Sequence, residues 1–431
     1  MISHKKHIIE YFQSGIKDTK KFKMGIEHEK FLFDQKTNKR VDYSTIKKMF
    51  SALTEFGWEP IKEKQNIIGL QKAGKNITLE PGNQIELSGD KLNNIHEACA
   101  ESHDYLFELQ QVTKKIGLKI VSAGFDPISA LGEVPNNPKQ RYEVMTKDMP
   151  DGGSLSLDMM YRTCGTQLNL DYNSEEDFIK KFKIINSLVP ISIALFANSS
   201  IVEKKNSGYM SYRSKVWQET SRGGLPEVFF DNMNFEKYAD FTINFPLLFI
   251  QNDKEYLSGK NYTFSDFMSG KIKEIDNRLP TENDLATHLS TIFTENRLKK
   301  YIELRSMDTC GWDCLCAGPA FNVGILYGNL DETYELISKW DKNKIINAYF
   351  EAPKKGFNTE LMGKDLLYWS SLLLNLSKKG LESRDILNKS NENEVKFLSH
   401  LEKLIDNKTT NADHMINKFS KDENLSELYD K

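Results

Sequence analysis

The sequence has few cysteines, few prolines and no long apolar run. Five cysteines in a chain of 431 residues do not make the disulfide scaffold of a small secreted protein. The longest apolar stretch, residues 188–202, is interrupted by Pro190 and Asn198 and is too short and too polar to span a bilayer. The opening residues MISHKKHIIEYFQSG lack the apolar segment and the cleavage site of a secretory signal. Together these absences predict a cytoplasmic protein that does not enter a membrane.

An excess of charge of either sign is also missing. Lysine plus arginine number 58 and aspartate plus glutamate 61, so we expect no electrostatic attraction to nucleic acid or to an anionic membrane. The fractions of hydrophobic residues, 39%, and of charged residues, 28%, are ordinary for a soluble globular protein. No internal repeat and no glycine-, serine- or proline-rich linker divides the chain. The length is compatible with two or three domains of about 150 residues, but we predict one catalytic domain over residues 1–431, with a helical C-terminal part at about 319–431.

Periodicity predicts strands early in the chain and helices late. Alternating patterns indicate strands at about 24–33, 160–172 and 297–305, and a hairpin-like segment at 66–89. Apolar residues at helical spacing indicate helices at about 1–20, 44–56, 91–117, 140–148 and 174–200, and again from 319 onward. Strand and helix do not alternate regularly, so the order favours an α+β fold over a doubly wound sheet.

Four of the predicted extended segments each carry polar side chains on one face. Residues two apart on a strand point the same way, and the segments read MGIEHEKFLF, NQIELS, YRTCGTQLNLDY and RLKKYIELRSMD. By this alternation the polar faces comprise Glu27 and Glu29; Gln84 and Glu86; Gln167 and Asn169; and Arg297, Lys299, Glu303 and Arg305. Glu80 stands just before the turn at Pro81 and Gly82, which leaves the direction of its side chain open.

An acidic strand face is either exposed to solvent or part of a site. A solvated face would include lysine and threonine, whereas three of these faces carry mainly Glu, Gln and Asn. Acids two residues apart also repel each other unless a positive charge lies between them. Carboxylates that converge on one cleft supply the oxygen ligands of a hard cation such as Mg²⁺, and the basic segment at 297–305 supplies charge for a polyphosphate. We therefore interpret the four segments as a Mg²⁺–nucleotide site on an antiparallel sheet.

Three shorter motifs do not carry a function. GLQKAGKN, residues 69–76, lacks the Ser or Thr of a P-loop, and a strand follows where a helix should begin. HEKFLF has no second histidine at the spacing of a zincin. CGWDCLC, residues 310–316, lacks the distant cysteine pair or histidine that would complete a zinc site. His28, His96 and His288 are expected to be structural histidines.

Taken together, the motifs resemble a known enzyme family. GIEHEKFLF, ITLEPGNQIELSG, DMMYRTCGTQLNLDY and RLKKYIELRSMD, in this order and spacing, are similar to the plant and proteobacterial type of glutamate–cysteine ligase. PNNPKQRYEVM, FANSSIVEKKNSGYMSYRSKVW and CAGPAFNVGILY extend the similarity over roughly residues 20–380. The resemblance implies a glutamine-synthetase-like fold, in which an antiparallel sheet lines the active site and helices surround it. It also implies ATP-dependent joining of the γ-carboxylate of glutamate to cysteine through a γ-glutamyl phosphate, the first step of glutathione synthesis.

The resemblance also implies roles for individual residues. Two or three Mg²⁺ ions and the co-substrate ATP would bind at the sheet, and the implied metal ligands are Glu27, Glu29, Glu80, Glu86 and Glu303, with Gln84 and Gln167 behind them. Arg305 would stabilise the transferring phosphoryl group, with Arg297 and Lys299 near the phosphates. The implied glutamate pocket holds Arg141 and Arg213, because the planar fork of arginine suits a carboxylate. Thr166 and Cys164 would lie beside this pocket, and the alternative for Cys164 is a small buried filler.

Two cysteines match a regulatory disulfide of the plant enzymes. Cys99 and Cys316 stand at the positions of one such pair, and the alternative is two buried free thiols. The second plant pair would fall at about 259–274, where no cysteine occurs. Leu248 stands where relatives tend to have tyrosine, which leaves the fine shape of the substrate pocket open.

Three other functions stay open on the sequence alone. The nearest is another ATP-dependent carboxylate–amine ligase with a different acceptor amine. A silent nucleotide-binding protein is disfavoured because it would not need mutually repelling acids beside Arg305, and a metal hydrolase is the most remote. We expect the partners to be glutamate, cysteine and ATP, with neither nucleic acid nor a membrane, and the chain to be a monomer or homodimer.

Overall fold

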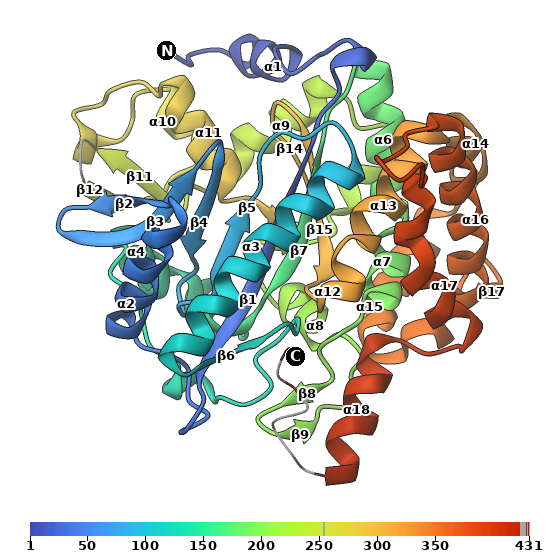
Figure 1. Ribbon diagram of the computed structural model, residues 1–431. Coiled ribbons are helices and arrows are strands. Elements are labelled where there is room, and N and C mark those ends of the chain that lie inside the picture. Colours follow the sequence, from blue (N-terminus) through green and yellow to red (C-terminus); the bar gives the residue numbers. More distant parts are fainter. Residues whose placement is uncertain (253–254, 423–427, 429, 431) are drawn as a thin grey trace.

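One nine-stranded antiparallel sheet forms the centre of the molecule (Figure 1). The computed structural model describes residues 1–252, 255–422, 428 and 430. The strands of the sheet are β1 (Met24–Asp34), β2 (Glu59–Glu63), β3 (Asn66–Lys72), β4 (Lys75–Leu79), β5 (Ile85–Ser88), β6 (Leu118–Val121), β7 (Gly165–Leu170), β14 (Asn296–Leu298) and β15 (Ile302–Asp308). Their order is β14-β15-β7-β1-β5-β4-β3-β2, and β6 pairs with the end of β1. The expectation of an α+β fold with an antiparallel sheet is confirmed.

The four segments with polar faces are neighbours in this sheet. β1 is hydrogen-bonded to β5 on one side and to β7 on the other, and β7 is hydrogen-bonded to β15. Because side chains alternate along a strand, Glu27 and Glu29 of β1 point to the face opposite the one taken by His28. The sheet therefore has a face that carries the carboxylates and a face that does not.

Helix α3 covers the second face. It runs over Ile95–Ile116, and Asn94 caps its start by accepting a hydrogen bond from the backbone N–H of Glu97. The Tyr105 ring lies 5.4 Å from the ring of His28, and Leu109 is fully buried in an apolar cluster shared with the sheet. In Figure 1, α3 crosses the sheet diagonally. Helix α2 (Tyr43–Leu53) contributes Ile46 and Phe50 to the same cluster, so this face is closed by packing.

The remaining elements surround the sheet. The other helices before β14 are α1 (Lys5–Gln13), α4 (Gln140–Asp148), α5 (Ser156–Arg162), α6 (Glu175–Ser187), α7 (Val189–Leu195), α8 (Tyr212–Gln218), α9 (Phe235–Asn244), α10 (Phe264–Met268) and α11 (Glu282–Ser290). Short two-residue and four-residue strands pair between them, namely β8 (Ile201–Val202) with β9 (Lys205–Asn206), β10 (Gly223–Gly224) with β13 (Phe293–Thr294), and β11 (Phe249–Asn252) with β12 (Glu255–Ser258).

The part after β15 is mainly helical, as predicted. Its helices are α12 (Trp312–Leu315), α13 (Ala317–Val323), α14 (Leu330–Ile337), α15 (Lys342–Lys355), α16 (Leu366–Arg384), α17 (Ser399–Asp406) and α18 (Asn411–Asp422), and one short hairpin, β16 (Glu360–Leu361) with β17 (Lys364–Asp365), interrupts them. They gather on one side of the molecule in Figure 1. Helix α16 packs closely against the segment Gly324–Gly328, so that a Cβ on Gly380 would lie 1.9 Å from the carbonyl oxygen of Gly324. Within the described residues, no helix combines the length and apolar character needed to cross a bilayer.

Two predicted strands differ from the structure. The segment 160–172 begins as helix α5, and its strand starts only at Gly165. Residues 156–162 contain leucine, two methionines and arginine and no β-branched side chain, which favours a helix. The segment 297–305 is a hairpin and not one strand: β14 ends at Leu298, and the chain turns back with the Lys299 N–H donating to the Tyr301 carbonyl at 2.8 Å. No glycine or proline marks this turn, so it has no signal in the local sequence.

Candidate active site

A pocket of about 190 Å³ opens on the face of the sheet that carries the carboxylates. It is lined by side chains from the central strands and from the segments that face them. The charged and amide members of the lining are Glu27, Glu29, Glu80, Glu86, Gln167, Arg141, Arg297 and Arg305. Tyr142 and Met145 of α4 and Phe249 of β11 supply much of the opposite wall. Four of the five acids predicted as metal ligands therefore meet in one pocket.

Strand register brings these acids together. Glu29 on β1 stands directly opposite Glu86 on β5, and Glu27 stands opposite Gln167 on β7. Glu80 follows β4, and its backbone N–H donates to the Gln84 carbonyl at 2.9 Å, which closes the turn. The turn points the Glu80 side chain into the pocket. Its direction, which the sequence left open, is thereby given by the structure.

The carboxylates repel one another in a buried place. Burial, together with the charges of Glu86 and Glu303, raises the pKa of Glu27 to about 7. Burial and the charge of Glu80 raise the pKa of Glu86 to about 7. The pKa of Glu29 is raised well above its ordinary value by burial and by Glu86 and Glu80. In the absence of a cation, the pocket therefore favours protonated carboxyl groups.

Three of the four pocket acids accept a hydrogen bond from a neutral donor that orients the carboxylate. Asn169 Nδ2 donates to Glu27 Oε1 at 2.7 Å, and Ser88 Oγ donates to Glu86 Oε1 at 2.8 Å. The backbone N–H of Gly165 donates to Glu29 Oε2 at 2.6 Å. The strand pattern had placed Asn169 on the polar face without giving it a role, and it had given no signal for the backbone donor of Gly165.

The loop before α4 holds the turn that carries Glu80. Asn137 Nδ2 donates to the Glu80 carbonyl at 2.6 Å, and both Lys139 Nζ at 2.7 Å and the Tyr142 hydroxyl at 2.9 Å donate to the Leu79 carbonyl. Lys139 is buried, and burial lowers its pKa to about 7. These three residues lie in the segment PNNPKQRYEVM, but the sequence did not indicate that they position Glu80.

The pocket suits a hard divalent cation by its chemistry. Its donors are carboxylate oxygens, and burial and mutual repulsion raise the pKa values of Glu27 and Glu86, which a bound cation would oppose. Among the described residues, no three side chains of His, Cys, Asp or Glu are grouped closely enough to hold a single ion. Among those residues, the pocket carboxylates are therefore not already arranged around one ion position.

Glu303 differs from the other four acids because two cations already hold it. Arg297 Nε donates to Glu303 Oε2, and Lys299 Nζ donates to Glu303 Oε1 at 2.8 Å. Burial alone would raise the pKa of Glu303, but Arg297 and Lys299 hold it well below its ordinary value. Neither Glu303 nor Lys299 lines the pocket, whereas Arg297 does. The sequence analysis had placed these residues on one strand; in the structure, Arg297 and Glu303 stand opposite each other across the β14–β15 hairpin.

The predicted arginines fall into two groups. Arg305 and Arg141 line the pocket; Arg305 Nη1 donates to Gln167 Oε1, and Arg141 Nη2 donates to the Tyr142 hydroxyl at 2.9 Å. Arg213 is buried outside the lining, where its Nη2 donates to the Arg305 carbonyl at 2.8 Å and its guanidinium lies 5.2 Å from the Trp217 ring. Arg213 thus supports the backbone of Arg305.

Three further predicted residues also lie outside the pocket lining. Thr166 is on the opposite face of β7 from Gln167, and its hydroxyl donates to that of Thr309 at 3.5 Å. Cys164 is buried in an apolar cluster with Phe31 and Phe33, which agrees with the alternative of a small buried filler. Gln84 donates to the carbonyls of Met160 and Thr163, both at 3.1 Å, and so braces the turn after β4 from behind.

Four of the five cysteines are joined in pairs. Cys99 of α3 and Cys316, which precedes α13, form a disulfide with their Cα atoms 5.8 Å apart. Cys310 and Cys314 form a second disulfide, which the sequence did not predict. The second pair lies in the segment 310–316, which lacks the further ligands of a zinc site.

The fold and the pocket first define a class of protein. An antiparallel sheet surrounded by helices, with carboxylates and arginines on its open face, has the glutamine-synthetase-like architecture. Residues 23–431 match the family described as glutamate–cysteine ligase family 2, and the chain belongs to that family. The resemblance drawn from the motifs is confirmed.

Individual relatives agree with this assignment. The chain is 39% identical over 419 residues to the chloroplastic glutamate–cysteine ligase B of Oryza sativa subsp. japonica, covering 96% of this chain and 83% of the relative. It is 39% identical over 418 residues to the chloroplastic enzyme of Nicotiana tabacum, covering 96% and 79%. The crystal structure of glutamate–cysteine ligase from Francisella tularensis in complex with AMP is similar in fold, with a TM-score of 0.51, 12% identity and coverage of 93% of this chain and 85% of that one.

The predicted cytoplasmic location is corrected by these comparisons. The plant relatives are named chloroplastic, and this contradicts the prediction of cytoplasm. The prediction rested on the lack of a secretory signal and of a disulfide scaffold. Neither feature separates the cytoplasm from other compartments into which proteins are not secreted.

Proposed function

We propose that the protein joins the γ-carboxylate of L-glutamate to the amine of L-cysteine, with conversion of ATP to ADP and phosphate, as a single catalytic unit. The observation that carries the proposal is the convergence of Glu27, Glu29, Glu80 and Glu86 on one pocket beside Arg141, Arg297 and Arg305. Membership of the glutamate–cysteine ligase family supports the same activity. ATP as the co-substrate is further supported by the AMP complex of the Francisella tularensis enzyme, whose fold is similar.

The proposed reaction has two steps. The γ-carboxylate of glutamate attacks the terminal phosphorus of ATP, and ADP leaves. The amine of cysteine then attacks the γ-carbonyl of the acyl phosphate, phosphate leaves, and the amine loses a proton. Both steps depend mainly on positioning and on neutralising negative charge.

The charged residues in and behind the pocket have different roles in binding the substrates and in neutralising their charge. Arg305, oriented by Gln167, would face the charge of the transferring phosphoryl group, and Arg297 would lie near the phosphates. Arg141, oriented by the Tyr142 hydroxyl, would bind the carboxylate of glutamate. Arg213 would act by holding the backbone of Arg305. Two or three Mg²⁺ ions would be held by the pocket carboxylates, with Glu303 joining if its pairing with Arg297 and Lys299 is exchanged, and they would neutralise phosphate oxygens.

The test is turnover by the purified protein. Mg²⁺, ATP, glutamate and cysteine should together yield phosphate and a dipeptide with the mass of γ-glutamylcysteine. Omission of either amino acid should reduce phosphate release to background. Phosphate release without the amino acids would indicate a hydrolase, and no release under any condition would contradict the proposal.

The acceptor amine is tested separately. Alanine, serine and glycine should be compared with cysteine at equal concentrations, and cysteine should give the highest kcat/KM. Equal or faster turnover with another amine would identify a carboxylate–amine ligase of different specificity. Leu248 is buried beside Phe249 of the pocket wall, so it can shape this preference only through its neighbours.

A further inference from the structure

A second and larger cavity lies away from the candidate active site. Its volume is about 480 Å³, and it shares no lining residue with the pocket on the sheet. The disulfide partners Cys310 and Cys314 are part of its wall, together with Trp312, His400, Asn411 and His414. The other disulfide differs, because neither Cys99 nor Cys316 lines this cavity. A small molecule that enters the cavity would therefore meet one disulfide of the chain.

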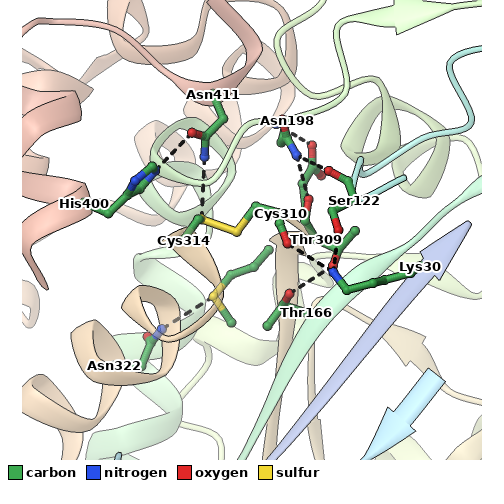
Figure 2. Close-up of a disulfide and its surroundings, with 12 residues drawn as sticks. Lys30, Ser122, Thr166, Asn198, Thr309, Cys310, Cys314, Asn322, His400 and Asn411 are labelled. Carbon is green, nitrogen blue, oxygen red and sulfur yellow. Dashed lines mark hydrogen bonds between the residues drawn. A yellow bond between two sulfur atoms is a disulfide. The ribbon is translucent and has the colours of Figure 1, made fainter. Parts of the chain in front are cut away.

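Asn411 links one sulfur of this disulfide to a histidine (Figure 2). Its Nδ2 donates to Cys314 Sγ at 3.6 Å, and its Oδ1 lies 3.0 Å from His400 Nε2. Because an amide oxygen can only accept, His400 Nε2 must donate. The histidine therefore fixes the amide so that its N–H points at sulfur. Figure 2 shows Asn411 between His400 and Cys314.

The two sulfurs are consequently different. Cys314 Sγ receives an amide N–H, and within the described part of the chain no hydrogen-bond donor reaches Cys310 Sγ. A donated hydrogen bond stabilises a thiolate more than it stabilises a disulfide sulfur, because the charge is greater. In thiol–disulfide exchange, the better-stabilised sulfur leaves and the other is attacked. The geometry thus gives the disulfide a direction of cleavage.

We propose that the Cys310–Cys314 disulfide is a thiol–disulfide exchange site, reached through this cavity by a low-molecular-weight thiol that attacks Cys310 while Cys314 leaves. The arrangement of Cys314, Asn411 and His400 and the position of the disulfide in the cavity wall carry the proposal. It does not depend on the reaction proposed for the pocket on the sheet.

The exchange balances with two equivalents of the thiol. The first thiolate forms a bond to Cys310 Sγ, the bond between Cys310 and Cys314 breaks, and its electron pair stays on Cys314 Sγ. A second thiolate attacks the external sulfur of this mixed disulfide and releases Cys310 as a thiolate. Both cysteines take up protons. The protein disulfide is reduced by two electrons, and the small thiol is oxidised to its disulfide.

Reduction by a small thiol followed by alkylation and peptide mass spectrometry tests the proposal. The oxidised full-length protein is treated at neutral pH with L-cysteine in one arm and reduced glutathione in another, without denaturant. We expect Cys310 and Cys314 to be alkylated before Cys99 and Cys316 in at least one arm, which also identifies the thiol that the cavity admits. Retention of the Cys310–Cys314 disulfide in both arms, or its reduction no faster than that of Cys99–Cys316, would overturn the proposal.

The site of attack is tested with the same protein. Rapid acid quenching should trap the small thiol on Cys310 and not on Cys314. Asn411→Ala, which removes the donor to Cys314, should slow the exchange roughly three- to tenfold, as expected for the loss of one hydrogen bond to a charged sulfur. Asn407→Ala is the matched control, because Asn407 is exposed at the end of α17 and lies outside the cavity.

Thermal unfolding of both asparagine variants shows whether either has lost its fold. If Asn411→Ala keeps the stability of the control but exchanges as fast as the unsubstituted protein, or if the adduct forms on Cys314, the assigned direction is wrong.

Discussion

Glu27 takes part both in the hydrogen bonds between neighbouring strands of the sheet and in the negative charge of the pocket. It lines the pocket, stands opposite Gln167, and accepts a hydrogen bond from Asn169. Its raised pKa reflects burial near Glu86 and Glu303. A neutral residue of the same shape would keep the packing and the hydrogen bond to Asn169 but would lose the charge that a cation needs.

Glu27→Gln should therefore lose almost all turnover while its fold remains intact. We expect a larger loss than in Asn169→Ala, which removes only the orienting partner and should cost about 10- to 100-fold, as is typical for residues behind a metal ligand. Steady-state assays with varied Mg²⁺, together with far-UV circular dichroism, measure both effects. Glu143→Gln, at an exposed position on α4, is the control. Near-normal turnover of Glu27→Gln would mean that Glu27 is not part of the catalytic site.

The ion pairs of Glu303 with Arg297 and Lys299 should contribute to the free energy of unfolding. Glu303 is buried between Arg297 and Lys299, so Glu303→Gln would leave a buried arginine and a partly buried lysine without a counter-charge. Breaking a buried pair from one side costs roughly 3–5 kcal/mol of unfolding free energy. Urea unfolding of the Mg²⁺-free protein measures this loss.

Glu282→Gln provides the comparison, because it breaks an ion pair that is exposed to solvent. Glu282 and its partner Lys300 are 62% and 40% exposed at their side chains, and such surface pairs contribute about 1 kcal/mol or less. Equal destabilisation by the two substitutions would contradict the view that Glu303 is the counter-charge of the β14–β15 hairpin.

At the scale of elements, the strands of the sheet could be predicted from the sequence more accurately than the turns between them. The alternation in MGIEHEKFLF and NQIELS correctly predicted that Glu27, Glu29 and Glu86 share a face, because side-chain alternation is a local property of a strand. The hairpin at Lys299–Tyr301 was missed, since it contains no turn residue. This hairpin places Glu303 opposite Arg297, and the two side chains are paired. The role of Glu303 as a metal ligand, which the family resemblance implies, stays a prediction.

Gly165, the first residue of β7, lies between Glu29 and Arg213. The N–H of Gly165 donates to Glu29, and a Cβ at this position would lie 2.8 Å from Arg213 Nη2, the atom that holds the Arg305 carbonyl. Gly165→Ala should therefore displace Arg213 and, through it, Arg305. A displacement of about 1 Å can cost up to about 100-fold in rate.

Kinetics of Gly165→Ala should show a fall in kcat with a change in melting temperature no greater than that of Gly25→Ala. Gly25 on β1 is the control, because a Cβ there would meet its nearest neighbour at 3.6 Å, an ordinary contact. If the two variants have the same kcat, the contact between Arg213 and Arg305 does not position the site.

At the scale of the whole molecule, the sequence was sufficient to predict which acids occur in the site, but not which contacts between segments hold them in place. The acids of β1 and β5 could be predicted from the sequence because they lie on regular strands. The support of Glu80 by Asn137 and Lys139, the position of Arg213 behind Arg305, and the Cys310–Cys314 disulfide could not be predicted. The first two depend on contacts between segments far apart in the chain, whereas the disulfide joins cysteines only four residues apart; local periodicity contains no information about any of the three.

The buried acids couple the stability of the whole protein to pH and to Mg²⁺. The pKa values of Glu27 and Glu86 are about 7 in the metal-free fold, whereas an unfolded glutamate titrates near about 4.3. Between these values the folded state holds more protons than the unfolded state, so the contribution is present at low pH and is lost as the pH rises through about 7. The loss from about pH 6 to about pH 8 should be roughly 1 kcal/mol for each of the two carboxyls.

Magnesium should reverse this dependence, because a cation replaces the protons and relieves the same repulsion. Melting temperatures of the protein in EDTA should fall between about pH 6 and about pH 8, and added Mg²⁺ should raise them more at the higher pH, where fewer protons compete. Glu27→Gln should reduce both the fall and the rise, since it removes one of the charges, while Glu143→Gln should reproduce the unsubstituted protein. An equal Mg²⁺ effect at both pH values would show that the ions do not bind at these carboxylates, and the role of the pocket as a metal–nucleotide site would have to be abandoned.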